Sequence, residues 1–273
     1  MIRIGLIGYG KAGAAVAQVL LQDPRFELRW IARRRVGIDA PPVGVPILSL
    51  EQALSPDWLG RHPVDGVIDF SSRESLLQYG PTARAQGWTV VSAISAYRDT
   101  DLAYARELGR HIRILCSPNI TIGINFMMVA ADLLRRVAPH ADVEILEQHF
   151  RDKPEVSGTA RKLAERLDLD EDRITSLRLG GIVGHHEVIF GFPYQTVRIV
   201  HDAIRREAFG TGAAFAMGEL VHRPAGFHTF EDLLLDRLRE GLVAPTMTKG
   251  PAGPRSVTTP RPDAGAALSV EAG

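Results

Sequence analysis

The chain has 273 residues, of which 45% are hydrophobic and 23% are charged, and this composition is typical of soluble globular proteins. Its 32 basic and 32 acidic residues balance, so the charge gives no support for general binding to nucleic acid or to an anionic membrane surface. The single cysteine, Cys116, excludes an internal disulfide and a cysteine-based zinc site. The first residues, Met1–Leu6, lack the pattern of a signal peptide, and no apolar run approaches the ~20 residues of a membrane helix, so we expect a cytoplasmic protein.

The first 32 residues follow the pattern of a dinucleotide-binding unit. A buried parallel strand is predicted over Ile2–Ile7, a helix over Ala14–Gln22 and a second strand over Phe26–Ala32. Between the first strand and the helix lies a G-x-G-x-x-G sequence, Gly8-Tyr9-Gly10-Lys11-Ala12-Gly13. The alternative is a plain glycine turn, but the strand before it and the helix after it favour a dinucleotide site. The predicted cofactor contacts in this loop are Gly8, Gly10, Lys11, Ala12 and Gly13.

The end of the second strand predicts which nicotinamide cofactor is bound. NAD enzymes place an acidic residue there for the ribose 2′-hydroxyl, whereas arginine suits the 2′-phosphate of NADP. This chain has Arg33-Arg34-Arg35 and no acid at that place. We therefore predict NADPH, held by Arg33 and Arg34, with NADH as the alternative cofactor and a solvated basic loop as the alternative role.

Strands and helices continue to alternate as far as Cys116. After a Gly- and Pro-rich loop at 36–48, the predicted elements are strands at 64–70, 88–92 and 112–116 and helices that end at 84 and 108, the first kinked or split at Gly80-Pro81. This alternation predicts a doubly wound parallel sheet, and ligands bind such sheets at the carboxyl ends of the strands. Asp69 is expected to accept hydrogen bonds in a turn there. The predicted cofactor contacts at these strand ends are Phe70, Ser92, Ala93, Ile94, Ser117 and Asn119.

The pattern changes after Asn119. An apolar helix is predicted over 124–137, and strands over 143–150, 173–179, 186–192 and 196–201 predict a mainly antiparallel sheet. Helices resume at 209–220 and at 230–239, the latter opened by a capping box from Thr229 to Asp232. We therefore predict a Rossmann-type domain at 1–118, completed by 209–240, and a second α+β domain at 119–208. Residues 241–273 read as a disordered tail. His185-His186 lacks a third ligand, so no metal site is predicted.

The stretch from His149 to Thr159 concentrates the candidate chemistry. If the strand runs on past Phe150, the side chains of His149, Arg151 and Lys153 share one face. They would gather beside Ser157-Gly158-Thr159, where a helix is predicted to begin, and a helix start favours small anions. The stretch thus suits a carboxylate held beside proton donors. The alternative is a polar surface turn with a serine cap.

The order of these motifs resembles that of the dihydrodipicolinate reductase family, from Ile2 to about Arg239. The family's H-H-R-H-K-x-D-A-P-S-G-T-A is similar to residues 149–160 here, which are one residue shorter. Its N-F-S-x-G-V-N corresponds to residues 119–125, and its R-x-G-x-I-V-G-x-H to residues 178–186. Its H-x-A-x-x-R-x-x-F-x-x-G-A corresponds to residues 201–213.

The resemblance implies an activity and roles for particular residues. The family reduces a cyclic dicarboxylate of lysine and diaminopimelate biosynthesis with a nicotinamide hydride, and forms homotetramers. His149 corresponds to its catalytic proton donor, and Lys153 to a lysine that assists protonation and binds substrate. The substrate contacts implied here are Phe150, Lys153, Ser157, Gly158, Thr159 and Arg206.

Several departures from the family cluster around the same stretch. Two of its motif histidines are Phe150 and Asp152 here, and its G-T-T-G loop is Ser92-Ala93-Ile94-Ser95. Because apolar replacement of polar contacts alters which substrate is accepted, three hypotheses stand. They are the lysine-pathway reaction, a paralogue that reduces a different cyclic imine or imino acid in secondary metabolism, and a protein that binds NADPH without turnover.

Overall fold

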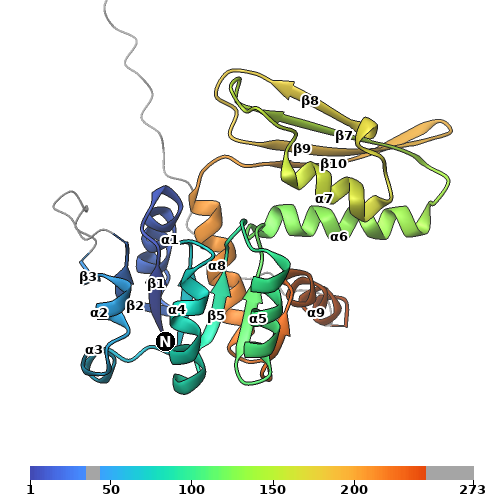
Figure 1. The fold of residues 1–273 in the computed structure, drawn as a ribbon. Helices are drawn as coiled ribbons and strands as arrows, with labels where there is room; N and C mark the ends of the chain where they lie inside the picture. Colours follow the sequence, from blue (N-terminus) through green and yellow to red (C-terminus); the bar gives the residue numbers. More distant parts are fainter. Residues whose placement is uncertain (35–43, 244–273) are drawn as a thin grey trace, which may run out of the picture.

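Residues 1–34 and 44–243 are described by the computed structural model, which contains two sheets (Figure 1). The first sheet has seven strands, all paired in parallel, in the order β11-β6-β5-β4-β1-β2-β3. The strands are β1 (Ile2–Ile7), β2 (Phe26–Ala32), β3 (Ile47–Leu48), β4 (Gly66–Asp69), β5 (Thr89–Ser92), β6 (Arg113–Cys116) and β11 (Gly226–His228). The chain changes direction across the sheet between β1 and β4, and ligands bind at such a switch point in doubly wound folds.

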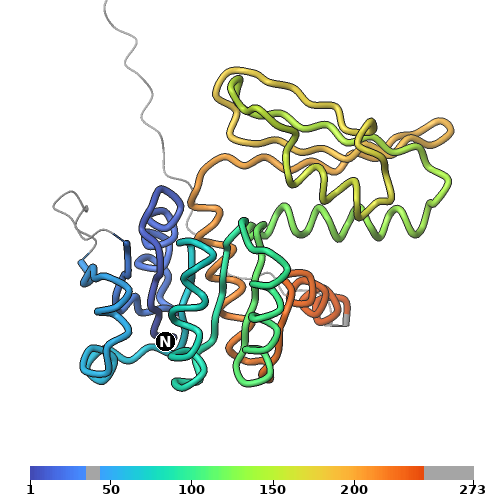
Figure 2. Tube along the Cα trace, in the orientation of Figure 1, coloured from blue at the N-terminus to red at the C-terminus, as the bar shows by residue number. Residues whose placement is uncertain are grey.

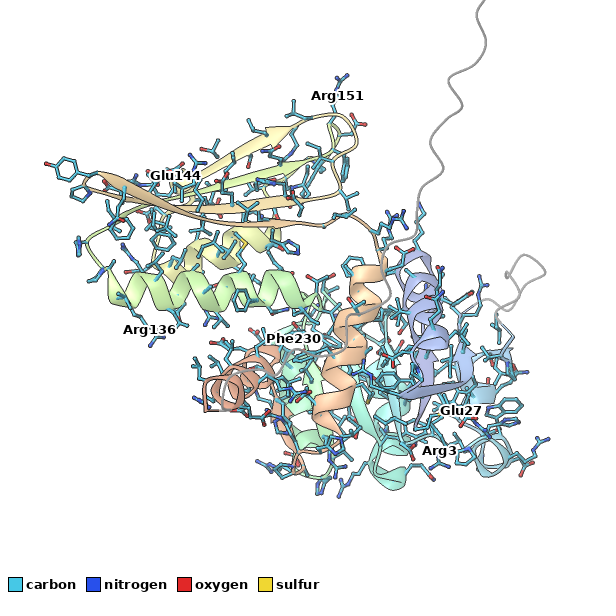
Figure 3. All side chains as sticks on the ribbon, turned by 180° about the vertical axis from the view of Figure 1, so that it is seen from behind. Arg3, Glu27, Arg136, Glu144, Arg151 and Phe230 are labelled. Carbon is cyan, nitrogen blue, oxygen red and sulfur yellow. The ribbon has the colours of Figure 1, made fainter. Side chains whose placement is uncertain are left out.

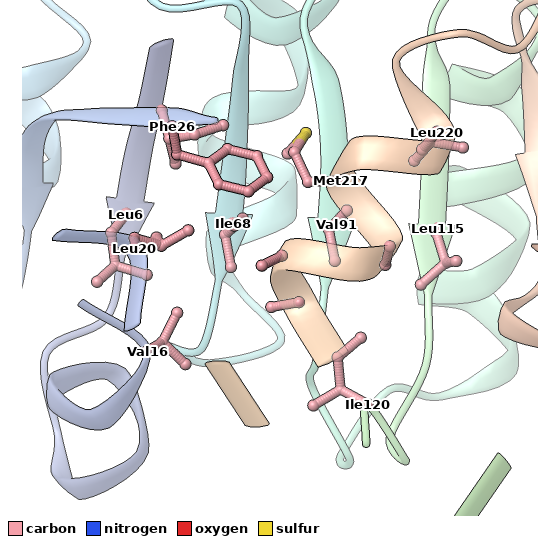
Figure 4. Close-up of a cluster of buried hydrophobic side chains, with 14 of the residues drawn as sticks. Leu6, Val16, Leu20, Phe26, Ile68, Val91, Leu115, Ile120, Met217 and Leu220 are labelled. Atoms are coloured by element: carbon pink, nitrogen blue, oxygen red, sulfur yellow. The ribbon is translucent and has the colours of Figure 1, made fainter. Parts of the chain in front are cut away.

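Helices cover both faces of this sheet. On one face lie α1 (Lys11–Gln22), α8 (Glu207–Leu220) and α9 (Phe230–Val243), whose apolar side chains join those of the strands in one core (Figure 4). On the other face lie α2 (Leu50–Ala53), α3 (Pro56–Arg61), α4 (Ser75–Gln86) and α5 (Asp99–Gly109). The helix α8 returns from the second half of the chain and packs on α1, so both halves stabilise the first core.

Among the described residues, helices lie on one face of the second sheet only. Its strands are β7 (Asp142–His149), β8 (Ile174–Arg178), β9 (His185–Phe192) and β10 (Gln195–Asp202), in the order β10-β9-β7-β8. The helices α6 (Ile122–Val137) and α7 (Gly158–Leu167) cover it, followed by the short 3₁₀ helix η1 (Glu171–Arg173). Two pairings are antiparallel and β7–β8 is parallel, since α7 provides the crossover that a parallel pair requires.

The chain passes between the two sheets twice (Figure 2). It leaves the first sheet after β6 and enters α6, and it returns from β10 into α8. The ends of β6 and β10 therefore lie near the carboxyl edge of the parallel sheet, where both halves contribute residues to one region.

The predicted fold class is confirmed, with corrections in detail. Part of the predicted 36–48 loop is the strand β3, because the backbone of Ile31 and Arg33 bonds to Pro46 and Leu48. Pro81 does not split α4, which runs through it with buried side chains on either side. The helix α9 continues to Val243, so the predicted tail does not start at residue 241. Arg35, the loop residues 36–43 and the tail residues 244–273 lie outside the described residues.

Candidate active site

The glycine-rich loop has the geometry of a dinucleotide site. Gly8 has φ +95°, and a Cβ there would lie 2.6 Å from the carbonyl of Phe70 on the neighbouring strand end. A Cβ on Gly13 would lie 2.1 Å from the carbonyl oxygen of Gly8, so this helix and strand pack at a distance that only glycine allows. Gly10 has no heavy atom within 4 Å of an ideal Cβ. The open space at Gly10, at the N-terminus of α1, fits a pyrophosphate.

Two hollows beside this loop contain the predicted arginines. One, of about 420 Å³, is lined by Gly8, Tyr9, Gly10, Arg33, Arg34, Phe70 and Ser71. The other, of about 310 Å³, shares Gly8, Arg33, Arg34 and Ser71 and extends to Glu74 and Gln78. Within the described residues neither Arg33 nor Arg34 forms an ion pair. Their guanidinium groups are therefore available to an anion at the end of β2.

Asp69 accepts hydrogen bonds in a turn, as expected. Its Oδ1 accepts from the backbone N–H of Ser71 at 2.9 Å and from the Ser71 hydroxyl at 2.5 Å. Burial raises the pKa of the Asp69 carboxyl to about 6. These bonds fix the turn that carries Phe70 against the glycine loop.

The ends of β5 and β6 complete the carboxyl edge of the sheet. Ser92 is buried and its hydroxyl shares a 2.8 Å hydrogen bond with Tyr97. Ile94 is only 7% exposed, whereas Ser95 is exposed. Ala93 donates its N–H to the carbonyl of Asp69 at 2.9 Å. The serines at 92 and 95 therefore offer different surfaces, and only Ser95 presents a hydroxyl to solvent.

Asn119 joins the two halves of the candidate site. Its carbonyl accepts hydrogen bonds from Ser117 and Asn125, both at 2.7 Å. Its side-chain oxygen accepts from the Thr159 hydroxyl at 3.2 Å, which places the start of α7 beside the end of β6. The candidate cofactor edge and the candidate substrate stretch are thus in direct contact.

The stretch after His149 is not extended, and that part of the expectation is wrong. The strand β7 ends at His149, and the N–H of Lys153 donates to the carbonyl of Phe150 at 3.1 Å, which closes a turn. Arg151 is exposed and extends outward from the rim of the second domain (Figure 3). His149, Arg151 and Lys153 therefore do not share a face, because a turn replaces the strand alternation.

His149 is the last inward-facing residue of β7 and is buried. Its Nδ1 lies 2.5 Å from Oε2 of Glu147. Its ring meets that of His186 edge-on, with centroids 5.3 Å apart. An ideal Cβ on Gly184 would lie 3.2 Å from its Nε2, so this nitrogen faces the loop before β9. The imidazole is held on one side by a carboxylate and presents its other nitrogen to that loop.

Glu147 was missed by the sequence reasoning. It is fully buried, and its carboxylate accepts from Arg178, Ser176, His149 and the N–H of Ser157. Burial raises the pKa of this carboxyl, but the hydrogen bonds, led by that of Arg178, outweigh burial and lower the pKa to about 2. An available signal was its position two residues before His149, which puts both on one face of the strand.

The start of α7 has the expected cap, and its serine is already engaged. The Ser157 hydroxyl accepts from the N–H of Thr159 at 3.2 Å and shares a 2.8 Å hydrogen bond with Nε2 of His186. Gly158 is exposed and has no heavy atom within 4 Å of an ideal Cβ. The helix start therefore offers open backbone at Gly158, while Ser157 holds the turn in place.

Arg206 lies apart from the other predicted substrate contacts. It is exposed just before α8 and lines a hollow of about 830 Å³ together with Lys11, Tyr9, Val183 and Ile204. His149, Lys153 and Ser157 do not line that hollow. The hollow lies between α1 and the segment that returns from the second sheet, next to the loop that contacts His149.

In the described parts of the chain, no group of three or more histidine, cysteine or acidic side chains is placed to hold a metal ion. His185 instead pairs through Nδ1 with Asp202 at 2.7 Å.

No helix in the described parts of the chain is long and apolar enough to cross a membrane.

Comparison with known proteins identifies the family. The family descriptions "Dihydrodipicolinate reductase, N-terminus" and "Dihydrodipicolinate reductase, C-terminus" match residues 2–120 and 123–234. A 4-hydroxy-tetrahydrodipicolinate reductase of Caldanaerobacter subterraneus subsp. tengcongensis is 30% identical over 259 residues, which cover 86% of this chain and 98% of that protein. The protein of the same name from Myxococcus xanthus is 32% identical over 218 residues, 71% of this chain and 79% of its own length.

Solved structures share the fold. Dipicolinate-bound dihydrodipicolinate reductase from Paenisporosarcina sp. TG-14 has a TM-score of 0.71 at 22% identity, covering 84% of this chain and 97% of that one. The DAP dehydrogenase of C. glutamicum in complex with DAP has a TM-score of 0.55 at 14% identity, covering 88% and 98%. With two matching family descriptions, a relative at 30% identity and a dinucleotide loop of the required geometry, the chain belongs to the dihydrodipicolinate reductase family and is an NAD(P)H-dependent oxidoreductase.

Proposed function

We propose that this protein is an NADPH-dependent reductase that delivers hydride to a cyclic imine or enamine carboxylate. The reaction would be the dihydrodipicolinate reductase step of lysine and diaminopimelate biosynthesis. The observation that carries this proposal is the buried pair of His149 and Glu147, 2.5 Å apart, beside a helix start that meets the cofactor edge through Thr159 and Asn119. An imidazole held by a carboxylate is a general acid–base arrangement.

The roles of the chain's own residues follow from this arrangement. The nicotinamide, when bound, supplies the hydride. The glycine loop and Arg33 with Arg34 would hold the phosphates of the dinucleotide, because they combine open backbone with guanidinium groups that form no ion pair among the described residues. His149 would donate the proton that balances the hydride, assisted by Lys153. The backbone at Gly158 would hold a substrate carboxylate at the positive end of α7.

A paralogue that reduces a different cyclic imine is the second candidate, and two observations favour it. Phe150, where the family has histidine, directly follows His149 and is 44% exposed. Ile94, where the family has a hydroxyl, is buried at the end of β5. Both changes remove polar contacts near the reacting groups, and a site that cannot pair a substrate's polar atoms rejects that substrate strongly.

A protein that binds NADPH without turnover is the third hypothesis. Against it stands the hydrogen-bonded environment of His149, since a binding protein has no need of a buried imidazole–carboxylate pair.

We also propose that the protein is a cytoplasmic homotetramer. Each subunit would have a dinucleotide-binding domain at 1–118 plus 209–240 and a second domain at 119–208. The tetramer is supported by the outer face of the second sheet, which no described helix covers and which exposes Leu177 and Val200.

The test is an assay of purified protein for NADPH oxidation against the lysine-pathway intermediate and a panel of other cyclic imines, with NADPH binding measured separately. Turnover of the pathway intermediate with the highest kcat/KM supports the main proposal. Preference for another imine supports the paralogue. Tight NADPH binding without turnover of any substrate would overturn both in favour of the non-catalytic protein.

A further inference from the structure

We propose that Glu147 is a positioning residue for His149. Glu147 and Arg178 together form an anchor that holds the stretch from His149 to Thr159 in the conformation that the reaction needs. The inference rests on the proposed function, in which His149 donates the proton. From the sequence alone, no role was predicted for either residue. We refer to the two side chains as the Glu147–Arg178 anchor.

The anchor carboxylate is fully buried and each of its oxygens is satisfied. Oε1 accepts from the Ser157 N–H at 3.1 Å and from the Ser176 hydroxyl at 2.8 Å. Oε2 accepts from Nδ1 of His149 at 2.5 Å. The Arg178 guanidinium binds both oxygens, with Nη1 at 2.9 Å and Nη2 at 2.8 Å. A bidentate pair with further donors permits one orientation of the carboxylate.

This orientation decides which nitrogen of His149 can exchange a proton. An ionised carboxylate can only accept hydrogen bonds, so the Nδ1 of His149 carries its hydrogen toward Glu147. The neutral imidazole therefore keeps Nε2 unprotonated, and the imidazolium donates from Nε2. Because Nδ1 is occupied, Nε2 is the nitrogen that can serve the reaction.

Arg178 extends the anchor to the turn that follows His149. Its Nε donates to the carbonyl of Lys153 at 3.0 Å, and its Nη2 donates to the carbonyl of Glu155 at 2.8 Å. The same guanidinium therefore fixes the backbone at Lys153 and the carboxylate that holds His149. Lysine could not replace this arginine, because it lacks the planar fork of donors.

The central experiment combines Glu147→Gln with His149→Gln, alone and together. Glu147→Gln should lower kcat by ~10²-fold or more, because an amide can donate to Nδ1 and favour the wrong tautomer. NADPH affinity should stay unchanged, since the cofactor loop is on the other sheet. If Glu147 acts through His149, the double variant should be no slower than His149→Gln alone. Additive losses would overturn the inference.

A spectroscopic measurement gives a readout independent of turnover. Nitrogen-15 NMR of labelled histidine should show neutral His149 protonated at Nδ1 in the unaltered protein and lose that signature in Glu147→Gln. A neutral His149 protonated at Nε2 in the unaltered protein would overturn the inference, even if Glu147→Gln fails to fold. A normal kcat for His149→Gln, when the unaltered protein shows the Nδ1 signature, would instead overturn the proposed role of His149.

Two further variants separate positioning from general stability. Glu231→Gln is the matched control, because both carboxylate oxygens of Glu231 also accept from one arginine, Arg166, and Glu231 lies on α9, outside the candidate site and the outer face of this sheet. It should leave kcat unchanged. Arg178→Lys keeps the charge but loses the fork, so it should lower kcat and raise KM while NADPH affinity stays constant. A normal kcat in Arg178→Lys would remove Arg178 from the anchor.

Discussion

Arg33 and Arg34 are the two residues on which the proposed cofactor choice rests. They follow β2 directly, line both hollows beside the glycine loop, and form no ion pair among the described residues. Guanidinium groups without acidic partners keep their full attraction for a phosphate, whereas a ribose hydroxyl gains little from them. The proposed preference for NADPH therefore rests on two side chains and can be tested at that level.

We expect Arg33→Asp combined with Arg34→Ala to shift the preference toward NADH, because the acid can accept from a ribose hydroxyl and repels a phosphate. The measurement is the ratio of kcat/KM for NADPH to that for NADH. Arg110→Ala removes an exposed arginine that pairs with Glu107; it serves as the control and should leave the ratio unchanged. An unchanged ratio in the double variant would show that the arginines do not contact the cofactor.

In the loop between β1 and α1, the physical reasons for glycine differ between Gly8 and Gly10. Gly8 needs its positive φ and its closeness to Phe70 for the fold itself. Gly10 has an ordinary φ of −86° and open space around it, so the folded chain alone does not require glycine there. Its absence of a side chain matters only if something else occupies that space.

This contrast predicts different outcomes for two alanine substitutions. Gly8→Ala should lower stability by about 1 kcal/mol or more, because its Cβ would meet backbone atoms in a strained conformation. Gly10→Ala should leave the melting temperature nearly unchanged yet weaken NADPH binding by ~10-fold or more. Thermal unfolding and cofactor titration of both variants, with the open surface position Gly60→Ala as control, measure the difference. Normal NADPH affinity in Gly10→Ala would argue against a phosphate at this place.

At the scale of the whole molecule, buried titratable groups couple the fold to pH. Burial lowers the pKa of His186 to about 3, with the nearby His149 and His201 acting in the same direction. Between pH 6.5 and 3 the unfolded chain therefore binds a proton that the folded chain does not, and stability falls as the pH drops. Asp69 opposes this between about pH 6 and 3.8, because its raised pKa lets the folded chain take up a proton first. Below about pH 4.5 Glu147 adds to the loss.

We expect the free energy of unfolding to fall slowly between pH 6.5 and 4.5 and steeply below that. One group that is protonated in the unfolded chain but not in the folded chain changes the free energy of unfolding by about 1.4 kcal/mol per pH unit. Urea unfolding across this range should show a shallower fall in His186→Gln, which keeps a hydrogen-bonding partner for Ser157 without a titrating ring. The same slope in both proteins would show that His186 is not buried in its neutral form.

The outer face of the second sheet belongs to the same scale. Val200 on β10 is half exposed there, Leu177 is exposed on β8 at the opposite edge of the same face, and no described helix covers this face. We expect Val200→Glu to dissociate the proposed tetramer, because a charge in an apolar interface costs more than its contacts return. Light scattering measures the mass, and Leu77→Glu on the exposed side of α4 is the control. A monomeric unaltered protein would contradict the tetramer directly.

Local signals in the sequence determined much of this protein. The strand–glycine loop–helix unit, the arginines after β2, the capping box at Thr229 and the position of His149 all depend on residues close together in the chain. Such features rest on backbone conformation and side-chain periodicity, which short segments already express. The doubly wound class followed because alternating strands and helices admit few other arrangements.

Only the tertiary structure decided the partners of those residues. The strand β11 has three residues and exists because β6 pairs with it. The pairing of β7 with β8 and β9 sets Glu147 opposite Ser176 and His186, and a shift of one residue would turn each of these side chains to the other face. The turn at Lys153, the contact of Thr159 with Asn119 and the role of Arg178 arise in the same way. Hydrogen bonds between distant segments depend on register and packing, which no local pattern of residues contains.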